Sequence, residues 1–187
     1  MITFITGGAR SGKSSLAEKI AAQLSGKVLY IATAAPLDEE MEKRIALHKK
    51  RRPKDWKTIE EPKNISRVLN KIELEDEYNE YPVILIDCLA LLVSNWLPLE
   101  EAEDIKQWDI LRSNLLSEIK IMLKSAKSLP QHVIIVSNEV GLGVVPEYPL
   151  GRLYRDLLGE VNQMTAEAAD EVYFMVSGIP MKIKGNQ

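Results

Sequence analysis

Cysteine and histidine are scarce in this sequence of 187 residues, which contains one cysteine and two histidines. A lone cysteine, Cys88, forms neither an internal disulfide nor a cysteine metal cluster. Long apolar stretches are also missing: none reaches the roughly 18 residues of a membrane-spanning helix. The first residues lack the charged start, apolar stretch and cleavage site of a secretory signal peptide. We therefore expect a protein without a membrane span, in the cytoplasm.

Charge of one sign does not dominate either, since the net charge is -3 and the isoelectric point is near 5.6. This balance argues against nucleic acid as the main partner. One local exception is the basic segment 48–52 (HKKRR), which suits an anionic ligand or a solvated helix end, and charge alone leaves both interpretations open. A hydrophobic fraction of 45% is typical of a globular protein. We expect one domain over residues 1–187.

Glycines are concentrated in the segment 7–14 (GGARSGKS), which matches the phosphate-binding pattern G-x-x-x-x-G-K-[ST]. The apolar residues 1–6 before it predict a strand, and the apolar spacing within residues 14–24 predicts a helix. In this context, called a P-loop, backbone N–H groups and the helix N-terminus surround an anion. The predicted nucleotide-binding residues of the loop are Gly7, Gly8, Ala9, Arg10, Ser11, Gly12, Lys13 and Ser14.

Two side chains of the loop and one distant acid have predicted roles around the phosphates. We expect Lys13 to reach the β- and γ-phosphates and Ser14 to bind Mg²⁺. P-loop enzymes also need an acid at the end of a neighbouring strand, and Asp87 ends the apolar run VILID. A turn residue or a helix cap is the alternative for Asp87, and the presence of the P-loop favours the metal role.

Apolar strand patterns alternate with helical patterns along the chain. Further strands are predicted at 27–33, 57–60, 83–88, 133–137, 171–177 and 181–184, and helices at 38–52, 62–72, 105–126 and 150–168. Residues 73–81 and 98–104 are acidic, and we expect them to be exposed connections. Strands that are apolar throughout and alternate with helices indicate an α/β fold, with a mostly parallel sheet covered by helices on both faces.

The two histidines lie in different contexts. His132 follows a proline at the start of a predicted strand, and we expect it at the surface. His48 falls on one stripe of its predicted helix, with basic residues around it. The apolar members of the stripe are Leu37, Met41 and Ile45. A histidine on such a stripe is usually a structural residue, whereas neutral imidazole beside cations is also suited to attack phosphorus. The pattern leaves both roles open.

A glycine-containing segment, 138–146 (NEVGLGVVP), follows the predicted strand 133–137. Ligands bind at the carboxyl edge of open α/β sheets, and Glu139 would then face the site. A plain connection between a strand and a helix is the alternative.

Six segments, which together span most of the chain, carry a resemblance to a known family. They are TGGARSGKSSLAE at 6–18, YIATA at 30–34, DEEMEKRIALHKKRRPKDWKTIEEP at 38–62, ILIDCLALLVSN at 84–95, SNEVGLGVVPEYPLGRLYRDLLGEVNQ at 137–163 and ADEVYFMVSGIPMKIK at 169–184. The sequence resembles the bifunctional adenosylcobinamide kinase / adenosylcobinamide-phosphate guanylyltransferase family of cobalamin assembly. A P-loop alone is common, but R-x-x-x-H with RP-x-x-W behind it and NEVG-x-G-x-VP are far more specific.

The resemblance implies a RecA-like P-loop fold, a homotrimer and two reactions with a corrinoid substrate. The first reaction phosphorylates adenosylcobinamide with ATP or GTP, and the second transfers GMP from GTP to the new phosphate through a guanylyl-histidine at His48. It also implies a second set of GTP contacts beyond the P-loop: Ala32, Thr33, Ala34, Lys49, Lys50, Arg51, Arg52, Glu60 and Asp87. Magnesium contact at Asp87 is implied to be direct or through water.

One residue departs from the family pattern, because Ala90 occupies a position where members often have threonine. This change removes no predicted catalytic group. Two other functions remain as alternatives: a P-loop kinase of another small molecule with a structural His48, and a nucleotide switch without group transfer.

Overall fold

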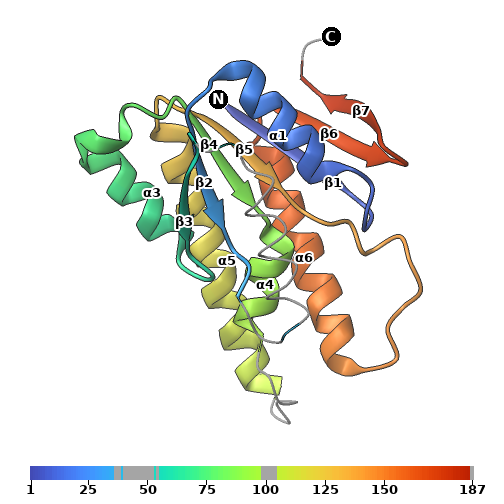
Figure 1. Ribbon diagram of the computed structural model, residues 1–187. Helices are drawn as coiled ribbons and strands as arrows, with labels where there is room; N and C mark the ends of the chain where they lie inside the picture. The colour runs from blue at the N-terminus through green and yellow to red at the C-terminus, as the bar shows by residue number, and fades with distance from the viewer. Residues whose placement is uncertain (36–38, 40–52, 54, 98–104, 186–187) are drawn as a thin grey trace.

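The computed structural model describes residues 1–35, 39, 53, 55–97 and 105–185. They form a seven-stranded sheet (Figure 1). The strand order is β3 (Lys57–Glu60), β2 (Val28–Ala32), β4 (Val83–Asp87), β5 (His132–Val136), β1 (Ile2–Gly7), β6 (Glu171–Val176) and β7 (Ile179–Lys184). All neighbouring strands pair in parallel except β6 and β7, which are antiparallel. The mostly parallel sheet predicted from the sequence is therefore confirmed.

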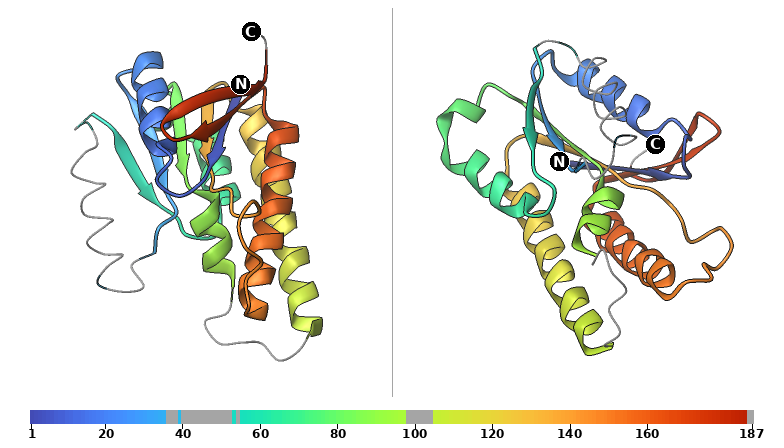
Figure 2. Two further views of the ribbon diagram at one scale, coloured as in Figure 1. Left: turned by 90° about the vertical axis from the view of Figure 1, so that its right-hand side faces the viewer. Right: turned by 60° about the horizontal axis from the view of Figure 1, so that its bottom comes forward.

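Helices cover both faces of the sheet, as predicted. They are α1 (Lys13–Leu24), α3 (Ile65–Leu74), α4 (Leu89–Trp96), α5 (Ile105–Ser128) and α6 (Pro149–Ala168), with a short 3-10 helix, η1 (Asp76–Tyr78). Helix α1 lies on one side of the sheet, and α4, α5 and α6 lie on the other (Figure 2). Helix α1 contacts β1, β4 and β5, and α3 packs against α5. Two layers of helices thus enclose the central strands.

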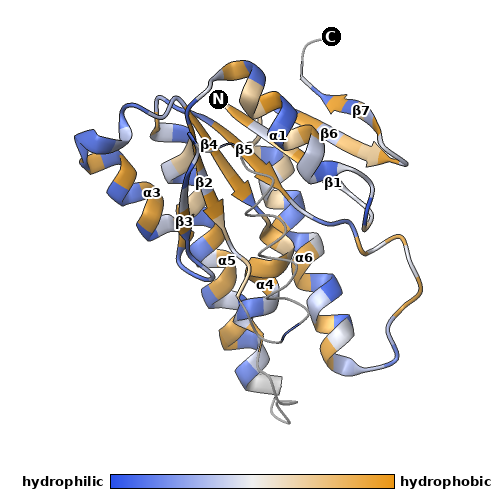
Figure 3. Cartoon of the chain, in the orientation of Figure 1, coloured by the Kyte–Doolittle hydropathy of each residue, from blue (hydrophilic) through white to orange (hydrophobic). Residues whose placement is uncertain are grey.

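The hydrophobic core lies on the central strands, where apolar residues form continuous runs (Figure 3). Strands β1 and β2 are buried along their full length. β-Branched and aliphatic side chains fit a strand that is covered on both faces, so these segments show no alternation with polar residues. In contrast, β7 is an edge strand with every residue exposed.

Most predicted elements agree with the structure to within a few residues, and three details are wrong. Helix α4 was not predicted. Helix α3 begins at Ile65 rather than at residue 62. The segment 73–81 is not uniformly exposed, because it includes the end of α3 and η1, where the ring of Tyr78 is buried. The predicted helix 38–52 and the connection 98–104 lie outside the described residues, apart from Glu39.

Candidate active site

The P-loop adopts a conformation that requires glycine at two positions. Gly7 ends β1 with φ 151°, and Gly12 precedes α1 with φ 96°. A Cβ atom on Gly7 would lie 2.6 Å from the carbonyl oxygen of Met175, which is backbone on the neighbouring strand β6. A side chain at residue 7 would therefore force the loop and β6 apart.

Backbone hydrogen bonds fix the loop between its neighbours. The N–H of Ser11 donates to Gly8 O at 3.3 Å, and the N–H of Gly178, in the β6–β7 turn, donates to Ser11 O at 3.0 Å. The Ser11 hydroxyl oxygen is buried and has no hydrogen-bond partner within the described part of the chain. An unpaired buried hydroxyl inside a loop of N–H donors is consistent with a site for an anion.

Lys13 is 7% exposed, and its Nζ donates to Gly8 O at 2.7 Å. Burial lowers the pKa of this ammonium group, while Cys88 and Asp87 raise it by smaller amounts. The ammonium thus lies within its own loop, close enough to the acid at the end of β4 to interact electrostatically. Ser14, in the first turn of α1, is half-buried, and Ala9 and Arg10 are exposed.

Asp87 lies at the carboxyl end of β4, where it is half-buried. The Tyr30 hydroxyl, on β2, donates to its Oδ2 atom at 2.7 Å. Because β5 alone separates β4 from β1 and all three strands are parallel, Asp87 and the P-loop lie at the same edge of the sheet. The structure therefore brings together the lysine and the acid that the sequence predicted.

The oxygen atoms at this edge fit magnesium. A serine hydroxyl and a carboxylate are ligands that Mg²⁺ prefers, and it commonly uses one or two carboxylates together with substrate phosphates. In the described ranges no group of three or more His, Cys, Asp or Glu residues gathers as a protein-only metal site. Ser14 and Asp87 supply the hydroxyl and the carboxylate that could hold Mg²⁺ together with a nucleotide.

Cys88 is not a candidate nucleophile. Burial, followed by the neighbouring charge of Asp87, raises the pKa of its thiol to about 12. The thiol consequently stays protonated near neutral pH, and a protonated thiol is a poor nucleophile.

The segment after β2 lies beside Asp87, but its threonine faces inward. Thr33 is fully buried; its Oγ1 donates to Cys88 O at 2.7 Å and accepts from the Cys88 N–H at 2.7 Å. Asn95, on α4, donates from Nδ2 to Thr33 O at 2.8 Å. The side chain of Thr33 thus joins the ends of β2 and β4. Ala32 is also buried, and Ala34 is half-buried. Asn95 had no role in the sequence prediction because α4 itself was missed.

Glu60 ends β3 and is exposed at the same edge. In the sheet register Ala32 is paired with Glu60 on one side and with Asp87 on the other. Three of the predicted nucleotide contacts therefore lie on neighbouring strand ends.

The segment 138–146 adjoins the P-loop, as the sequence suggested for a ligand-binding loop. The N–H of Glu139 donates to Gly7 O at 2.8 Å, and the Glu139 carboxylate accepts from the Gly141 N–H at 2.5 Å. Asn162, on α6, donates to Asn138 O at 2.8 Å and so attaches the loop to the helix. The side chain of Val144 is 94% exposed. Asn162 had no predicted role, because its partner Asn138 lies 24 residues away in the chain.

Five predicted site residues, His48, Lys49, Lys50, Arg51 and Arg52, lie outside the described residues. Trp56 is described: its ring is buried and lies 6.4 Å, between centroids, from the ring of Tyr30. Trp56 therefore lies beside Tyr30, whose hydroxyl contacts Asp87.

His132, the second histidine, was predicted at the surface and is instead half-buried. It begins β5, and its Nε2 lies 2.8 Å from the hydroxyl oxygen of Thr3. Burial is the largest cause that lowers the pKa of the imidazole, and the N-terminal amine lowers it further. His132 lies at the amino ends of the strands, whereas the P-loop follows the carboxyl end of β1.

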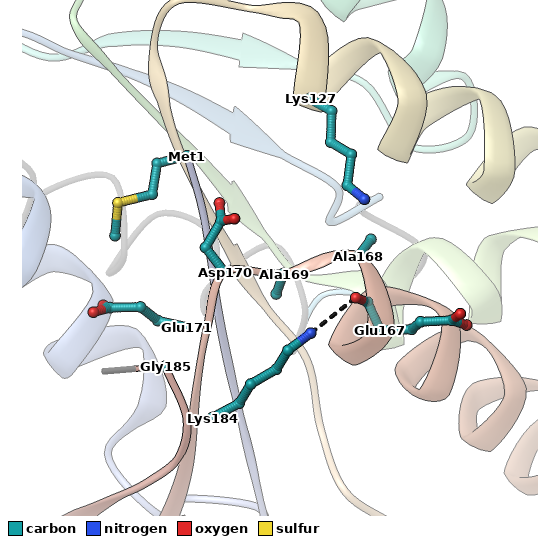
Figure 4. Close-up of a pocket in the computed structure, with 9 residues that line it drawn as sticks. All are labelled: Met1, Lys127, Glu167, Ala168, Ala169, Asp170, Glu171, Lys184 and Gly185. Carbon is teal, nitrogen blue, oxygen red and sulfur yellow. Dashed lines mark hydrogen bonds between the residues drawn. The ribbon is translucent and has the colours of Figure 1, made fainter. Parts of the chain in front are cut away.

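A cavity of about 590 Å³ also lies at the amino edge of the sheet (Figure 4). Lys184 crosses it and donates from Nζ to the carbonyl oxygens of Ala166 and Glu167, near the end of α6. None of the predicted site residues lines this cavity. The candidate active site is thus at the opposite edge of the sheet.

Among the described helices none is long and apolar enough to cross a membrane.

A parallel sheet with a P-loop after β1, a buried lysine and an acid after β4 defines a P-loop nucleotide-binding protein. A model of the family described as "Cobinamide kinase / cobinamide phosphate guanyltransferase" matches residues 3–183, and the chain belongs to this family.

Named relatives match over nearly the whole chain. The sequence is 40% identical over 187 residues to the bifunctional adenosylcobalamin biosynthesis protein CobU of Escherichia coli, covering 98% of this chain and 100% of that protein. It is 42% identical over 187 residues to the protein of that name from Salmonella typhimurium, with the same coverage. It is also 42% identical over 185 residues to CobP of Pseudomonas aeruginosa, covering 99% of this chain and 98% of that protein.

The fold is similar to a known RecA-like structure. The crystal structure of the RadB recombinase superposes with a TM-score of 0.51 at 16% identity, covering 92% of this chain and 73% of that chain. This likeness supports the P-loop fold.

Proposed function

We propose that the protein phosphorylates adenosylcobinamide with ATP or GTP and then transfers GMP from GTP to the product, giving adenosylcobinamide-GDP. The observation that carries the proposal is the family match over residues 3–183, together with a P-loop whose Lys13 lies near Asp87. The two alternatives, another small-molecule kinase and a nucleotide switch, account for the P-loop but not for the match over the whole chain.

In the first reaction the hydroxyl oxygen of the substrate's aminopropanol arm attacks the γ-phosphorus. The bond between the γ-phosphorus and the β–γ bridging oxygen breaks, the nucleoside diphosphate leaves, and the hydroxyl proton is released to solvent. Lys13 and the N–H groups of the loop offset the charge on the β- and γ-phosphates. Most of the catalysis in such a transfer comes from position and charge, so the reaction needs no protein nucleophile.

In the second reaction we assign the nucleophile to His48. A neutral imidazole nitrogen attacks the α-phosphorus of GTP, a P–N bond forms, pyrophosphate leaves and the ring proton is lost. A phosphate oxygen of adenosylcobinamide phosphate then attacks the same phosphorus and breaks the P–N bond, and the ring takes up a proton from solvent as it leaves, which restores neutral histidine. The cations Arg44, Lys49, Lys50, Arg51 and Arg52 surround His48 in the sequence, which favours its neutral form and offsets phosphate charge.

Ser14 and Asp87 are the residues proposed to hold Mg²⁺, directly or through water. When bound with the nucleotide, this ion neutralises negative charge on the phosphates. The chain's own contribution is to place a hydroxyl and a carboxylate at one edge of the sheet.

We further propose a single domain over residues 1–187, a cytoplasmic location and a homotrimer, which follow from the sequence and the family resemblance. Light scattering tests the assembly. A trimer has three times the 21.1 kDa mass of one chain, and a mass of one or two chains contradicts the assignment.

Labelling with GTP that is radioactive at the α-phosphate tests the guanylyl-histidine. We expect label on the protein that is lost in acid and stable in base. His48→Ala should abolish the label and GMP transfer and leave phosphorylation of adenosylcobinamide measurable. His132→Asn is the matched control, because His132 is the second of the two histidines and should not affect labelling.

The outcomes separate the three functions. Label that persists in His48→Ala places the nucleophile elsewhere. Phosphorylation of adenosylcobinamide by the wild-type protein without any label leaves the kinase reaction alone, and phosphorylation of another small molecule in its place favours the alternative kinase. Nucleotide binding without either transfer favours a switch.

A further inference from the structure

The hydrogen bond between Tyr30 and Asp87 joins a buried phenol to the acid assigned to the metal. In the sheet register Ala32 pairs with Asp87 and Tyr30 pairs with Leu85, so Tyr30 lies two residues before the position opposite the acid. Side chains two residues apart on a strand point to the same face. The phenol therefore extends along the sheet toward the strand end and reaches Oδ2 at 2.7 Å.

The hydroxyl is held in position by packing. The Tyr30 side chain is 2% exposed, and its ring lies against that of Trp56, with an interplanar angle of 32°. A buried ring with two side-chain torsions has little freedom once it is packed on both sides. Its hydroxyl is consequently a fixed donor, whereas the half-buried carboxylate of Asp87 rotates unless something restrains it.

We propose that Tyr30 is a positioning residue that orients the Asp87 carboxylate for the metal–nucleotide complex. The hydrogen bond engages Oδ2, and Oδ1 is then the oxygen that would bind an ion at this edge of the sheet. Removal of a partner that fixes a ligating carboxylate typically lowers metal affinity by about 10–100-fold. This inference rests on the proposed metal role of Asp87.

The test measures the gain in nucleotide affinity that Mg²⁺ provides. Calorimetry gives the dissociation constant of a GTP analogue with a methylene group in place of the α–β bridging oxygen, once with Mg²⁺ and once with EDTA. The analogue prevents transfer to a protein nucleophile. The ratio of the two constants is the metal-dependent gain, and it is independent of turnover.

Tyr30→Phe removes only the hydroxyl and keeps the ring against Trp56, so the fold should persist. We expect the metal-dependent gain to fall about tenfold, the effect of one lost hydrogen bond to a charged group, with little change in EDTA. Tyr173→Phe is the matched control, because Tyr173 also donates its hydroxyl to a carboxylate, that of Glu171, at 3.3 Å on β6. The control should keep the wild-type ratio.

The double variant Tyr30→Phe/Asp87→Asn distinguishes positioning from packing. If Tyr30 acts through Asp87, Asp87→Asn lowers the gain and adding Tyr30→Phe changes it no further. An effect of Tyr30→Phe that persists in the Asp87→Asn background, or an equal loss of affinity with Mg²⁺ and EDTA, overturns the proposal. A ratio of the two dissociation constants that is unchanged in Tyr30→Phe also overturns the proposal.

The same measurements distinguish the role of Tyr30 from the metal role of Asp87, on which it depends. A normal gain in Asp87→Asn overturns the metal role of Asp87 and the role of Tyr30 together. A reduced gain in Asp87→Asn with a normal gain in Tyr30→Phe overturns the role of Tyr30 alone. Failure of the proposed reactions themselves is seen independently, as absence of phosphorylated or guanylylated corrinoid with the wild-type protein.

Discussion

Lys13 is a buried cation that donates to a carbonyl of its own loop. Burial disfavours the charged form of an ammonium group, which explains why its pKa is lowered. Negative phosphates bound in the loop would offset the cost of burying the ammonium group, because they would place negative charge beside it.

Lys13→Ala should reduce kinase and guanylyltransferase activity together, each by about 100-fold or more, because both reactions lose the same stabilisation of phosphate charge. Steady-state assays of the two products measure the effect. Lys19→Ala, an exposed lysine on the same helix, is the control and should retain both activities. Normal phosphorylation of adenosylcobinamide by Lys13→Ala would contradict the P-loop assignment.

His132 should make stability depend on pH in a defined direction. Burial and the N-terminal amine lower the pKa of the folded imidazole, and Glu171 and Asp170 oppose this by smaller amounts. The unfolded chain therefore binds the proton more readily than the folded protein. The free energy of unfolding should therefore fall as pH drops below about 6.5, the pKa of free histidine, toward the lowered pKa of the folded state.

Urea unfolding of the wild type and His132→Gln at pH 7.5, 6.5 and 5.5 measures this contribution. The variant should lose less stability between the first and the last pH, since glutamine does not titrate. The difference between the two proteins isolates His132 from the carboxylates, which titrate in both. Identical pH dependence would show that the imidazole ionises equally in the folded and unfolded chains.

At the scale of elements, the junction of β1 and α1 depends on Gly7. Gly7→Ala should lower the free energy of unfolding by roughly 1–3 kcal/mol, because φ 151° is strained for alanine and its Cβ meets the Met175 carbonyl. Nucleotide affinity should fall as well. Chemical unfolding and calorimetry measure the two effects, and Gly26→Ala, with no atom within 4 Å of the added Cβ, is the control. A wild-type stability for Gly7→Ala would contradict the close approach.

The strands were predictable because burial on both faces leaves an apolar run that ends at a polar or glycine residue. Asp87 ends β4 in this way, and Gly7 ends β1. Helix α4 was missed for the same reason. Its residues LALLVSNW follow a strand and are themselves largely apolar, so the pattern does not mark where the strand ends and the helix begins.

Contacts between distant elements were not predictable from spacing. Tyr30 and Asp87 are 57 residues apart, and Asn162 and Asn138 are 24 apart. Their approach depends on the strand order β3-β2-β4-β5-β1, which no local pattern encodes. Local patterns in the sequence therefore predicted Lys13 and Asp87 as site residues, whereas only the fold shows that they lie at one sheet edge and that Tyr30 contacts Asp87.

At the scale of the whole molecule, one edge of the sheet holds the predicted site residues that the structure describes. The P-loop lies at the end of β1, and Asp87 ends β4. The 138–146 loop follows β5 and contacts the P-loop through the hydrogen bond from Glu139 N–H to Gly7 O. Within the described ranges this edge contains one P-loop. We propose that the two reactions, which occur at different phosphorus atoms, use the same bound triphosphate position in turn.

A single inhibitor should consequently act equally on both reactions. A GTP analogue with methylene groups at both bridging positions cannot transfer either its γ-phosphoryl or its guanylyl group, and it should compete with the nucleotide in each assay. On the proposal that one site serves both reactions, we expect the same inhibition constant in the two assays, and one analogue bound per chain by calorimetry. Inhibition constants that differ by about tenfold, equivalent to 1.4 kcal/mol, would instead indicate separate nucleotide sites for the two transfers. Two bound analogues per chain would lead to the same conclusion, and Lys13→Ala would then show which of the two sites is the P-loop.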